Sequence, residues 1–300
     1  MAWRTRFAPA PTGYLHLGHV VNAIHVWGLA RAFGGDVLLR IEDHDRTRCR
    51  VAFEDALLDD LDWLGFVPDI GSTDSFRASR AVGGTPHPQR QSDNEGRYAA
   101  ALAALSDRAL TYVCTCTRRD IAQQAPHAPG EEPRYPGTCR AARHDAAASL
   151  ARRACIADGD IAFHDGRLGP IRQSPAEQCG DVLVRDRHGQ WTYQFAVVVD
   201  DMAHAIDVVI RGEDLLPSTG RQLQLAQLLD REQPLRWWHH PLLVHPDGRK
   251  LSKANRDTSI RERRAAGAHA AGLLGEAAFL SGLLPAARDL TIDELPALFR

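Results

Sequence analysis

The sequence predicts an α/β fold: a parallel sheet of the Rossmann-like kind, with a small insertion and a short helical C-terminal region. The main observation is that strand-like and helical patterns alternate over the first 65 residues. Such an order forms parallel βαβ units, because each helix crosses back over the sheet. A proline-rich segment with three cysteines predicts the insertion, and the Ala/Leu-rich residues 254–300 predict the helical region.

The first two strands and helices follow from apolar spacing. Residues 5–8 are short and extended, and the apolar run at 37–41 is typical of a parallel strand that is buried on both faces. Helical spacing predicts one helix that ends at Gly34 and another that ends at Gly65. Their apolar faces are Val20, Ile24 and Trp27 in the first helix and Phe53, Leu57, Leu61 and Leu64 in the second.

The rest of the chain mixes loops, helices and strands. Gly, Ser, Thr and Pro dominate residues 71–91, which predicts a loop, and four prolines with a glycine make 123–136 irregular. The other expected elements are a helix at 99–110, strand-like or buried segments at 181–184 and 191–199, a strand at 207–210 and a helix capped by Ser218.

Composition is that of a soluble globular protein. Of the 300 residues 44% are hydrophobic and 25% are charged. The formal net charge of −2 gives no overall positive field, so a nucleic acid would have to bind to local basic patches. Neither a signal peptide nor a membrane-spanning run is expected, and six cysteines in this length are no disulfide framework. We therefore expect a cytoplasmic protein, and a monomer because no long amphipathic surface is left over.

The two lysines of the chain stand three residues apart. The 36 basic side chains include only Lys250 and Lys253, and all others are arginine. A second lysine placed at random would fall this close to the first only ~2% of the time. The compact ammonium suits phosphate contacts that the wide guanidinium does not reproduce. The pair therefore predicts a phosphate-binding loop, with coding bias as the alternative.

The most specific motif is the string RFAPAPTGYLHLGH at residues 6–19. His16 and His19 begin the first predicted helix, beside its free N–H groups and the positive end of its dipole, where phosphates bind. Gly18 between them allows a nucleotide to approach closely. Two exposed histidines at a helix start are the alternative for the pair alone, and the whole string favours a nucleotide site.

Together with GRKLSK at residues 248–253, this loop resembles the signatures of the class I aminoacyl-tRNA synthetases. Residues 16–19 are similar to the HIGH signature, residues 250–254 are similar to KMSKS, and the lead-in at 6–13 is similar to the glutamyl branch. The resemblance implies an ATP-dependent ligase in which a carboxylate attacks the α-phosphate of ATP, with Mg²⁺, to give an acyl-adenylate. It implies catalytic roles for His16, His19, Lys250 and Lys253, and ATP binding by His16, Gly18, His19 and Lys253.

The same resemblance implies a glutamate pocket. The matching positions are Arg6, Ala8, Ala10, Glu42, Tyr193 and Arg211. Arg6 and Tyr193 would hold the side-chain carboxylate. Glu42 would hold the ammonium and Arg211 the α-carboxylate, each at the end of a predicted strand, where open α/β sheets bind ligands. A surface ion-pair set is the alternative.

Two positions depart from the family pattern. Ala10 stands where the family usually has serine, which removes one hydrogen bond worth about 1 kcal/mol. Leu251 stands where the signature has methionine, a swap that conserves volume. Neither departure changes the implied activity.

Three of the six cysteines suit a structural zinc site. Cys114, Cys116 and Cys139 lie around the irregular segment, and a tetrahedral zinc would supply the folding energy that this segment lacks. The other cysteines are scattered and expected to be inert: Cys49, Cys155 and Cys179.

The fourth zinc ligand is open from the residues alone, because His127 and His144 both suit the metal. The arrangement Tyr-x-x-x-Cys at 135–139 resembles a short glutamyl subfamily, which implies Tyr135 as this ligand. The same region carries six arginines that would suit a tRNA backbone, with a solvated arginine face as the alternative: Arg118, Arg119, Arg140, Arg143, Arg152 and Arg153.

The end of the chain selects among the glutamyl enzymes. A full glutamyl-tRNA synthetase continues after the lysine signature into a large anticodon-binding domain, for which residues 254–300 are too few. The resemblance, over about residues 4–255, is therefore to truncated paralogues that use ATP to attach L-glutamate to the queuosine base in the anticodon loop of tRNA(Asp). Three alternatives stay open: a compact glutamyl-tRNA synthetase that charges the 3′ end of tRNA(Glu), a small-molecule adenylating enzyme, and a non-catalytic zinc-stapled RNA-binding module.

Four parts of the chain follow from these expectations. They are the first half of a Rossmann-like nucleotide-binding catalytic domain at 1–110, a zinc-binding insertion at 111–145, the second half of the catalytic domain at 146–255, and a short helical tail without an anticodon-binding domain at 256–300.

Overall fold

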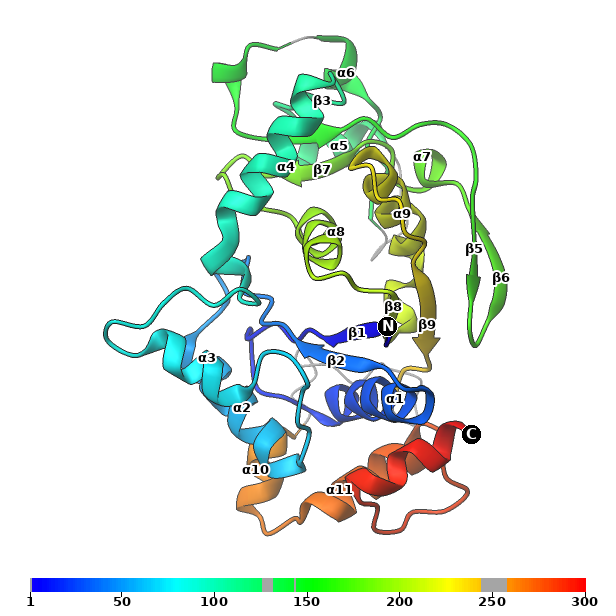
Figure 1. The fold of residues 1–300 in the computed structure, drawn as a ribbon. Coiled ribbons are helices and arrows are strands. Elements are labelled where there is room, and N and C mark those ends of the chain that lie inside the picture. The colour runs from blue at the N-terminus through cyan, green and yellow to red at the C-terminus, as the bar shows by residue number, and fades with distance from the viewer. Residues whose placement is uncertain (1, 126–131, 143, 244–257) are drawn as a thin grey trace. The chain divides into compact units, whose positions relative to one another are not determined.

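The computed structural model describes residues 2–125, 132–142, 144–243 and 258–300 (Figure 1). Lys250, Lys253 and His127 therefore lie outside the described residues. The chain divides into two compact units: unit 1 comprises Met1–Asn94, Ile206–Leu215 and Leu235–Arg300, and unit 2 comprises Glu95–Ala205 and Leu216–Pro234. In the described part of the chain, no helix combines the length and the hydropathy that a membrane crossing requires.

Unit 1 is built on parallel strands, as the sequence predicts. β1 (Arg4–Phe7) pairs in parallel with β2 (Asp36–Leu39), and β8 (Val208–Gly212) pairs in parallel with β9 (Arg236–His240). The two pairs lie side by side, since the backbone N–H of Asp207 donates to the carbonyl of Arg4 over 2.8 Å. The three strands expected in this part of the chain are confirmed.

The helices of unit 1 begin with α1 (Leu17–Phe33), which packs on β1 and β2, and α2 (Val51–Leu64). Both end at the predicted glycines, since Gly34 and Gly65 adopt left-handed φ angles of 71° and 83°. The remaining helical segments are α3 (Thr73–Arg80), α10 (Ile260–Ala265), α11 (Ala270–Leu280) and the 3₁₀ segments η1 (Gln91–Asn94) and η5 (Ile292–Phe299). A further 3₁₀ segment, η3 (Glu213–Ser218), begins in unit 1 and ends in unit 2.

The prediction of a loop over 71–91 is wrong, because α3 lies within it. Ser72 caps this helix, and its hydroxyl accepts the backbone N–H of Ser75 over 3.2 Å. Phe76 anchors it, fully buried and stacked 3.8 Å from the ring of His87. A helix with one large apolar residue shows no periodicity that a sequence pattern could detect.

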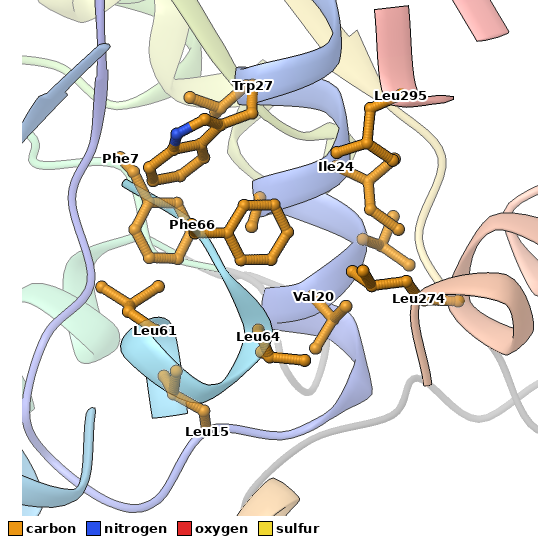
Figure 2. Close-up of a cluster of buried hydrophobic side chains, with 14 of the residues drawn as sticks. Phe7, Leu15, Val20, Ile24, Trp27, Leu61, Leu64, Phe66, Leu274 and Leu295 are labelled. Atoms are coloured by element: carbon orange, nitrogen blue, oxygen red, sulfur yellow. The ribbon is translucent and has the colours of Figure 1, made fainter. Parts of the chain in front are cut away.

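The core of unit 1 gathers around α1 (Figure 2). The Trp27 ring of α1 lies 5.4 Å from Phe7 of β1 and 4.8 Å from Phe66. Leu274 of α11 and Leu295 of η5 belong to the same cluster of buried side chains. The helical residues near the C-terminus thus pack into the core of unit 1.

Unit 2 contains an antiparallel sheet and a hairpin. The sheet has the order β3 (Thr111–Val113), β4 (Arg152–Ala154) and β7 (Val182–Arg185), and the hairpin joins β5 (Ile161–Asp165) to β6 (Gly169–Gln173). Its helical segments are α4 (Glu95–Asp107), α5 (Arg118–Gln124), α6 (Thr138–Ala142), η2 (Ala146–Ala148), α7 (Pro175–Gln178), α8 (Tyr193–Ala203) and α9 (Thr219–Leu228).

Two expectations for unit 2 need correction. The segment 191–199 is buried but mostly helical, because α8 begins at Tyr193. A continuous apolar run lacks the polar spacing that separates a buried helix from a buried strand. Ser218 stands at the N-cap position of α9 but makes no capping hydrogen bond, and its hydroxyl accepts from Nε2 of Gln194 over 2.9 Å instead.

Candidate active site and metal centre

The two histidines of the predicted nucleotide loop cap the N-terminus of α1. Nδ1 of His16 accepts the backbone N–H of Gly18, and Nδ1 of His19 accepts the backbone N–H of His16, each over 3.1 Å. The two rings lie 4.0 Å apart. An imidazole that accepts on Nδ1 carries its proton on Nε2 when it is neutral. The loop thus holds two imidazoles at the positive end of a helix, a place that favours phosphate.

Gly18 makes room for the ring of His16. A Cβ at this position would lie 3.0 Å from Cε1 of His16, closer than ordinary contacts allow. Glycine therefore leaves room for the His16 ring to fold back onto the helix. The prediction that Gly18 binds ATP stays a prediction.

A cavity of about 380 Å³ opens in front of the two histidines. It lies at the carboxyl ends of β8 and β9, where ligands bind in α/β sheets. Its volume is within the usual range for small-molecule sites. The polar residues of its lining are Thr12, His16, His19, Asn22, Arg211, Asp214 and His240.

The structure brings several predicted glutamate residues to this region of unit 1. Ala10 and Arg211 line the cavity. Arg6 is buried and donates from Nη1 to the carbonyl of Ile210 over 3.4 Å, beside Arg211. Glu42 is buried in an ion pair with Nη2 of Arg40 at 2.8 Å. Ala8 is half-buried and directly follows β1, at the start of the loop that leads to His16.

Three further predicted residues lie in unit 2 or outside the described residues. Tyr193 begins α8 and is half-buried in unit 2. Lys250 and Lys253 lie outside the described residues. The roles predicted for these three side chains therefore stay predictions.

Sequence reasoning missed Asn22, Asp214 and His240 of the cavity lining. Asn22 lies one helical turn after His19, so the helical period could have indicated it. Asp214 follows Arg211 by three residues, in the 3₁₀ segment η3, which no sequence pattern indicated. His240 ends β9, and its position at a strand end was the available signal.

Three thiols of unit 2 come together as a metal-binding cluster. The sulfur atoms of Cys114, Cys116 and Cys139 all lie within 4.8 Å of one another. Tetrahedral zinc with Zn–S bonds of ~2.3 Å places sulfurs roughly 3.8 Å apart. The Tyr135 hydroxyl lies 3.6 Å from Sγ of Cys114 and 3.9 Å from Sγ of Cys116. The cluster can hold a metal ion such as zinc.

The surroundings of Cys139 favour its thiolate form. Burial raises the pKa of this thiol, but hydrogen bonds with Tyr135, Thr115 and Cys116 lower it to about 5. A metal ligand has to be a thiolate, so one donor is prepared for binding. His144 approaches the cysteine cluster less directly than Tyr135 does, since its Nε2 lies 3.3 Å from the hydroxyl of Thr115.

Arg153 faces the cysteine cluster. It is 7% exposed, and its guanidinium carbon lies 3.6 Å from the centre of the Tyr135 ring. Its Nε–H donates to Sγ of Cys114 over 3.3 Å, and its Nη1–H donates to the carbonyl of Asp181 over 2.7 Å. Because it is buried, Arg153 is removed from the set of arginines that could meet tRNA.

The other described arginines of that set differ in exposure. Arg118 and Arg119 are exposed on α5. Arg140 is half-exposed and pairs with Asp181 at 3.3 Å, and Arg152 donates to backbone carbonyls. For these four arginines, contact with tRNA stays a prediction, with a solvated arginine face as the alternative.

Gly180 keeps the backbone of Tyr135 in place. The Tyr135 N–H donates to the carbonyl of Cys179 over 2.9 Å. Gly180 has a left-handed φ of +67°, and a Cβ on it would lie 2.2 Å from the Tyr135 carbonyl oxygen.

Gly180→Ala is therefore expected to lower the free energy of unfolding by about 2–4 kcal/mol, because it adds left-handed strain to a backbone collision. Gly137→Ala is the matched control, since Gly137 has a φ of +82° with no atom within 4 Å of its Cβ position. The control should lose only about 1–2 kcal/mol. Urea unfolding measures both, and equal losses would contradict the collision.

Comparison with known proteins defines the class first. Residues 2–275 match the family described as tRNA synthetases class I (E and Q), catalytic domain. The parallel sheet and the histidine pair at the first helix of unit 1 thus belong to a class I synthetase catalytic domain, an ATP-dependent ligase.

Similarity to curated relatives identifies a narrower family within this class. The glutamyl-Q tRNA(Asp) synthetase of Nitratidesulfovibrio vulgaris is 39% identical over 292 residues, which cover 94% of this chain and 87% of the relative. That of Symbiobacterium thermophilum is 39% identical over 304 residues, with 98% and 91% covered. The relative from Leptothrix cholodnii is 38% identical over 309 residues, with 98% and 96% covered. The chain belongs to the class I tRNA synthetases (E and Q) and, within them, to the glutamyl-Q tRNA(Asp) synthetase family.

Solved structures share the fold. A glutamate tRNA ligase from Elizabethkingia meningosepticum has a TM-score of 0.78 at 25% identity, covering 99% of this chain and 64% of that one. The glutamate-tRNA synthetase of Elizabethkingia anophelis gives a TM-score of 0.79 at 25% identity, covering 99% and 65%. The chain thus spans slightly less than two thirds of these ligases.

Proposed function

We propose that this chain activates L-glutamate with ATP and transfers it to the queuosine base in the anticodon loop of tRNA(Asp). The observation that carries the proposal is the cavity of unit 1, which joins His16 and His19 at a helix N-terminus to Arg211 at a strand end. Membership of the glutamyl-Q tRNA(Asp) synthetase family supplies the acceptor.

The buried charges of unit 1 suit the three charged groups of glutamate. Arg211 would hold the α-carboxylate, and Arg6, with Tyr193, the side-chain carboxylate. Glu42 would hold the ammonium. Arg6, Glu42 and Arg211 are 5%, 6% and 3% exposed, and charges buried to this extent need partners of opposite charge. The ion pair with Arg40 would orient the carboxylate of Glu42.

The reaction has two steps. A carboxylate oxygen of glutamate attacks the α-phosphorus of ATP, the bond to the bridging oxygen breaks, and pyrophosphate leaves. A hydroxyl of the queuosine cyclopentenediol then attacks the activated carbonyl carbon, and AMP leaves as the ester forms. His16 and His19 would stabilise negative charge on the phosphates, together with Lys250 and Lys253. Mg²⁺ would neutralise phosphate charge when bound.

A structural zinc ion in unit 2 is the second part of the proposal. Cys114, Cys116 and Cys139 would supply three ligands and Tyr135 the fourth. The Tyr135 hydroxyl lies next to two of the thiols and accepts the backbone N–H of Cys139 over 2.9 Å, which supports it over His144.

Arg153 should strengthen this zinc site, since its positive charge offsets the excess negative charge of three thiolates. Arg153→Met is expected to weaken zinc binding about 10- to 100-fold, measured by competition with a chromophoric chelator. Arg152→Met is the matched control, because its guanidinium contacts the carbonyls of Ser149 and Ala151. Equal affinities in the two variants would contradict the role of Arg153.

The protein is proposed to act as a monomer in the reducing cytoplasm. All six cysteines are free thiols in the structure. Size-exclusion chromatography with light scattering tests the monomer.

The test of function supplies labelled glutamate and ATP to the purified protein with total tRNA and identifies the labelled acceptor. Label on tRNA(Asp) that depends on queuosine and survives oxidation of the 3′ ends is the expected result. Label on the 3′ end of tRNA(Glu) would favour a compact charging enzyme instead. No label and no glutamate-dependent pyrophosphate exchange would favour a small-molecule adenylating enzyme or a non-catalytic RNA-binding module.

A further inference from the structure

Arg211, which lines the cavity, is held in its orientation by three neighbouring groups. It is 3% exposed, and its Nε–H donates to Nε2 of His239 over 3.0 Å. Its Nη2 donates to the carbonyl of Leu215 over 3.1 Å. Its guanidinium carbon lies 4.8 Å from the centre of the Trp237 ring, a distance typical of cation–π contacts.

The register of two strands produces this arrangement. Arg211 of β8 and His239 of β9 are register partners, so their side chains leave the same face of the sheet. Trp237 precedes His239 by two residues and shares this face. The Trp237 and His239 rings are 8° from parallel, and His239 is fully buried. The packing of Trp237 against His239 therefore fixes the orientation of the imidazole that accepts the hydrogen bond from Arg211.

The hydrogen bond also defines the protonation state of His239. A guanidinium has donors and no acceptor, so Nε2 of His239 has to accept, and the ring is neutral with its proton on Nδ1. The imidazole and the Leu215 carbonyl carry no net charge. They orient the guanidinium of Arg211 through its Nε–H and Nη2 donors.

We propose that His239 is a positioning residue for substrate binding: it orients Arg211 to bind a carboxylate of the amino-acid substrate. This inference rests on the proposed function, in which Arg211 contacts glutamate. His239 itself touches neither glutamate nor ATP in this proposal.

Two substitutions test the role. His239→Leu removes the acceptor and keeps an apolar side chain in the buried position. His239→Gln places an amide oxygen near the former Nε2. Hydrogen bonds to charged groups are strong, so the KM for glutamate in pyrophosphate exchange should rise about tenfold or more in His239→Leu. The KM for ATP should change by less than about twofold, and His239→Gln should restore most of the glutamate affinity.

Substrate analogues test whether the effect passes through Arg211. 4-Aminobutanoate lacks the α-carboxylate, and 2-aminobutanoate lacks the side-chain carboxylate. Each is measured as a competitive inhibitor of glutamate-dependent exchange. His239→Leu should weaken the binding of 2-aminobutanoate, which retains the α-carboxylate proposed to bind Arg211. It should spare 4-aminobutanoate, which lacks that carboxylate. In an Arg211→Lys background, His239→Leu should have little further effect on the KM for glutamate.

Three results would overturn the inference: an unchanged KM for glutamate in His239→Leu, an equal rise in the KM values for glutamate and ATP, or equal weakening of both analogues. Each applies while the wild-type protein shows glutamate-dependent exchange. Absence of that exchange in the wild type would instead overturn the proposed function, so the two failures are distinguishable.

Discussion

Replacement of His16 by serine is expected to slow glutamate-dependent pyrophosphate exchange by about 10²- to 10³-fold, the usual loss when one group that stabilises transition-state charge is removed. Stability should hardly change. The His16 side chain caps α1 by accepting the N–H of Gly18, and serine is a good N-cap residue. Exchange kinetics and thermal unfolding measure the two effects separately.

His16→Ala is the matched variant. It removes the imidazole and the cap together, so it should lose the same activity and also about 1 kcal/mol of stability. A serine variant with full activity would show that the imidazole serves only as a cap, and would contradict the proposed phosphate contact.

Replacement of Cys139 by serine is expected to abolish the zinc binding proposed for unit 2. One of three thiols in a compact cluster is lost, and Cys139 lies in the short helix α6. Structural zinc contributes folding free energy on the order of 10 kcal/mol in small zinc domains. The thermal midpoint should therefore fall by roughly 10 °C or more, and the zinc content should fall from one ion per chain.

Cys155→Ser is the control for this change. Cys155 is half-buried and lies outside the cluster, and burial raises the pKa of its thiol. It should keep one zinc ion per chain and an unchanged midpoint. Full zinc content in Cys139→Ser, measured by elemental analysis, would exclude this cysteine as a ligand.

The histidine loop could be predicted because its parts are adjacent in sequence. A strand, a helix start and two histidines three residues apart fix the place of both imidazoles relative to the helix N-terminus. The cysteine cluster was predictable for a similar reason, since Cys114 and Cys116 are close in sequence and Cys139 follows just after the segment predicted to be irregular.

The contacts behind these residues could not be predicted. Arg211 and His239 are 28 residues apart and meet only through the register of β8 with β9. Arg153 was one of several arginines in the sequence, and only the fold shows which of them is buried against a thiol. α3 was missed because capping by Ser72 and a single buried ring leave no periodic signal.

The division of unit 1 along the chain has a consequence for synthesis on the ribosome. β1 pairs with β2 and also contacts β8, yet Arg4 and Asp207, whose backbone hydrogen bond joins β1 to the residue before β8, are separated by most of unit 2. At 5–20 residues per second, translation takes about 10 to 40 s to bridge that interval. During this time the edge of β1 that later meets β8 has no partner strand. Unit 2 is completed only afterwards, because its last segment, Leu216–Pro234, follows β8 in the chain. Chaperone binding to nascent chains should therefore be strongest before β8 is made, and slower translation of unit 2 should prolong it.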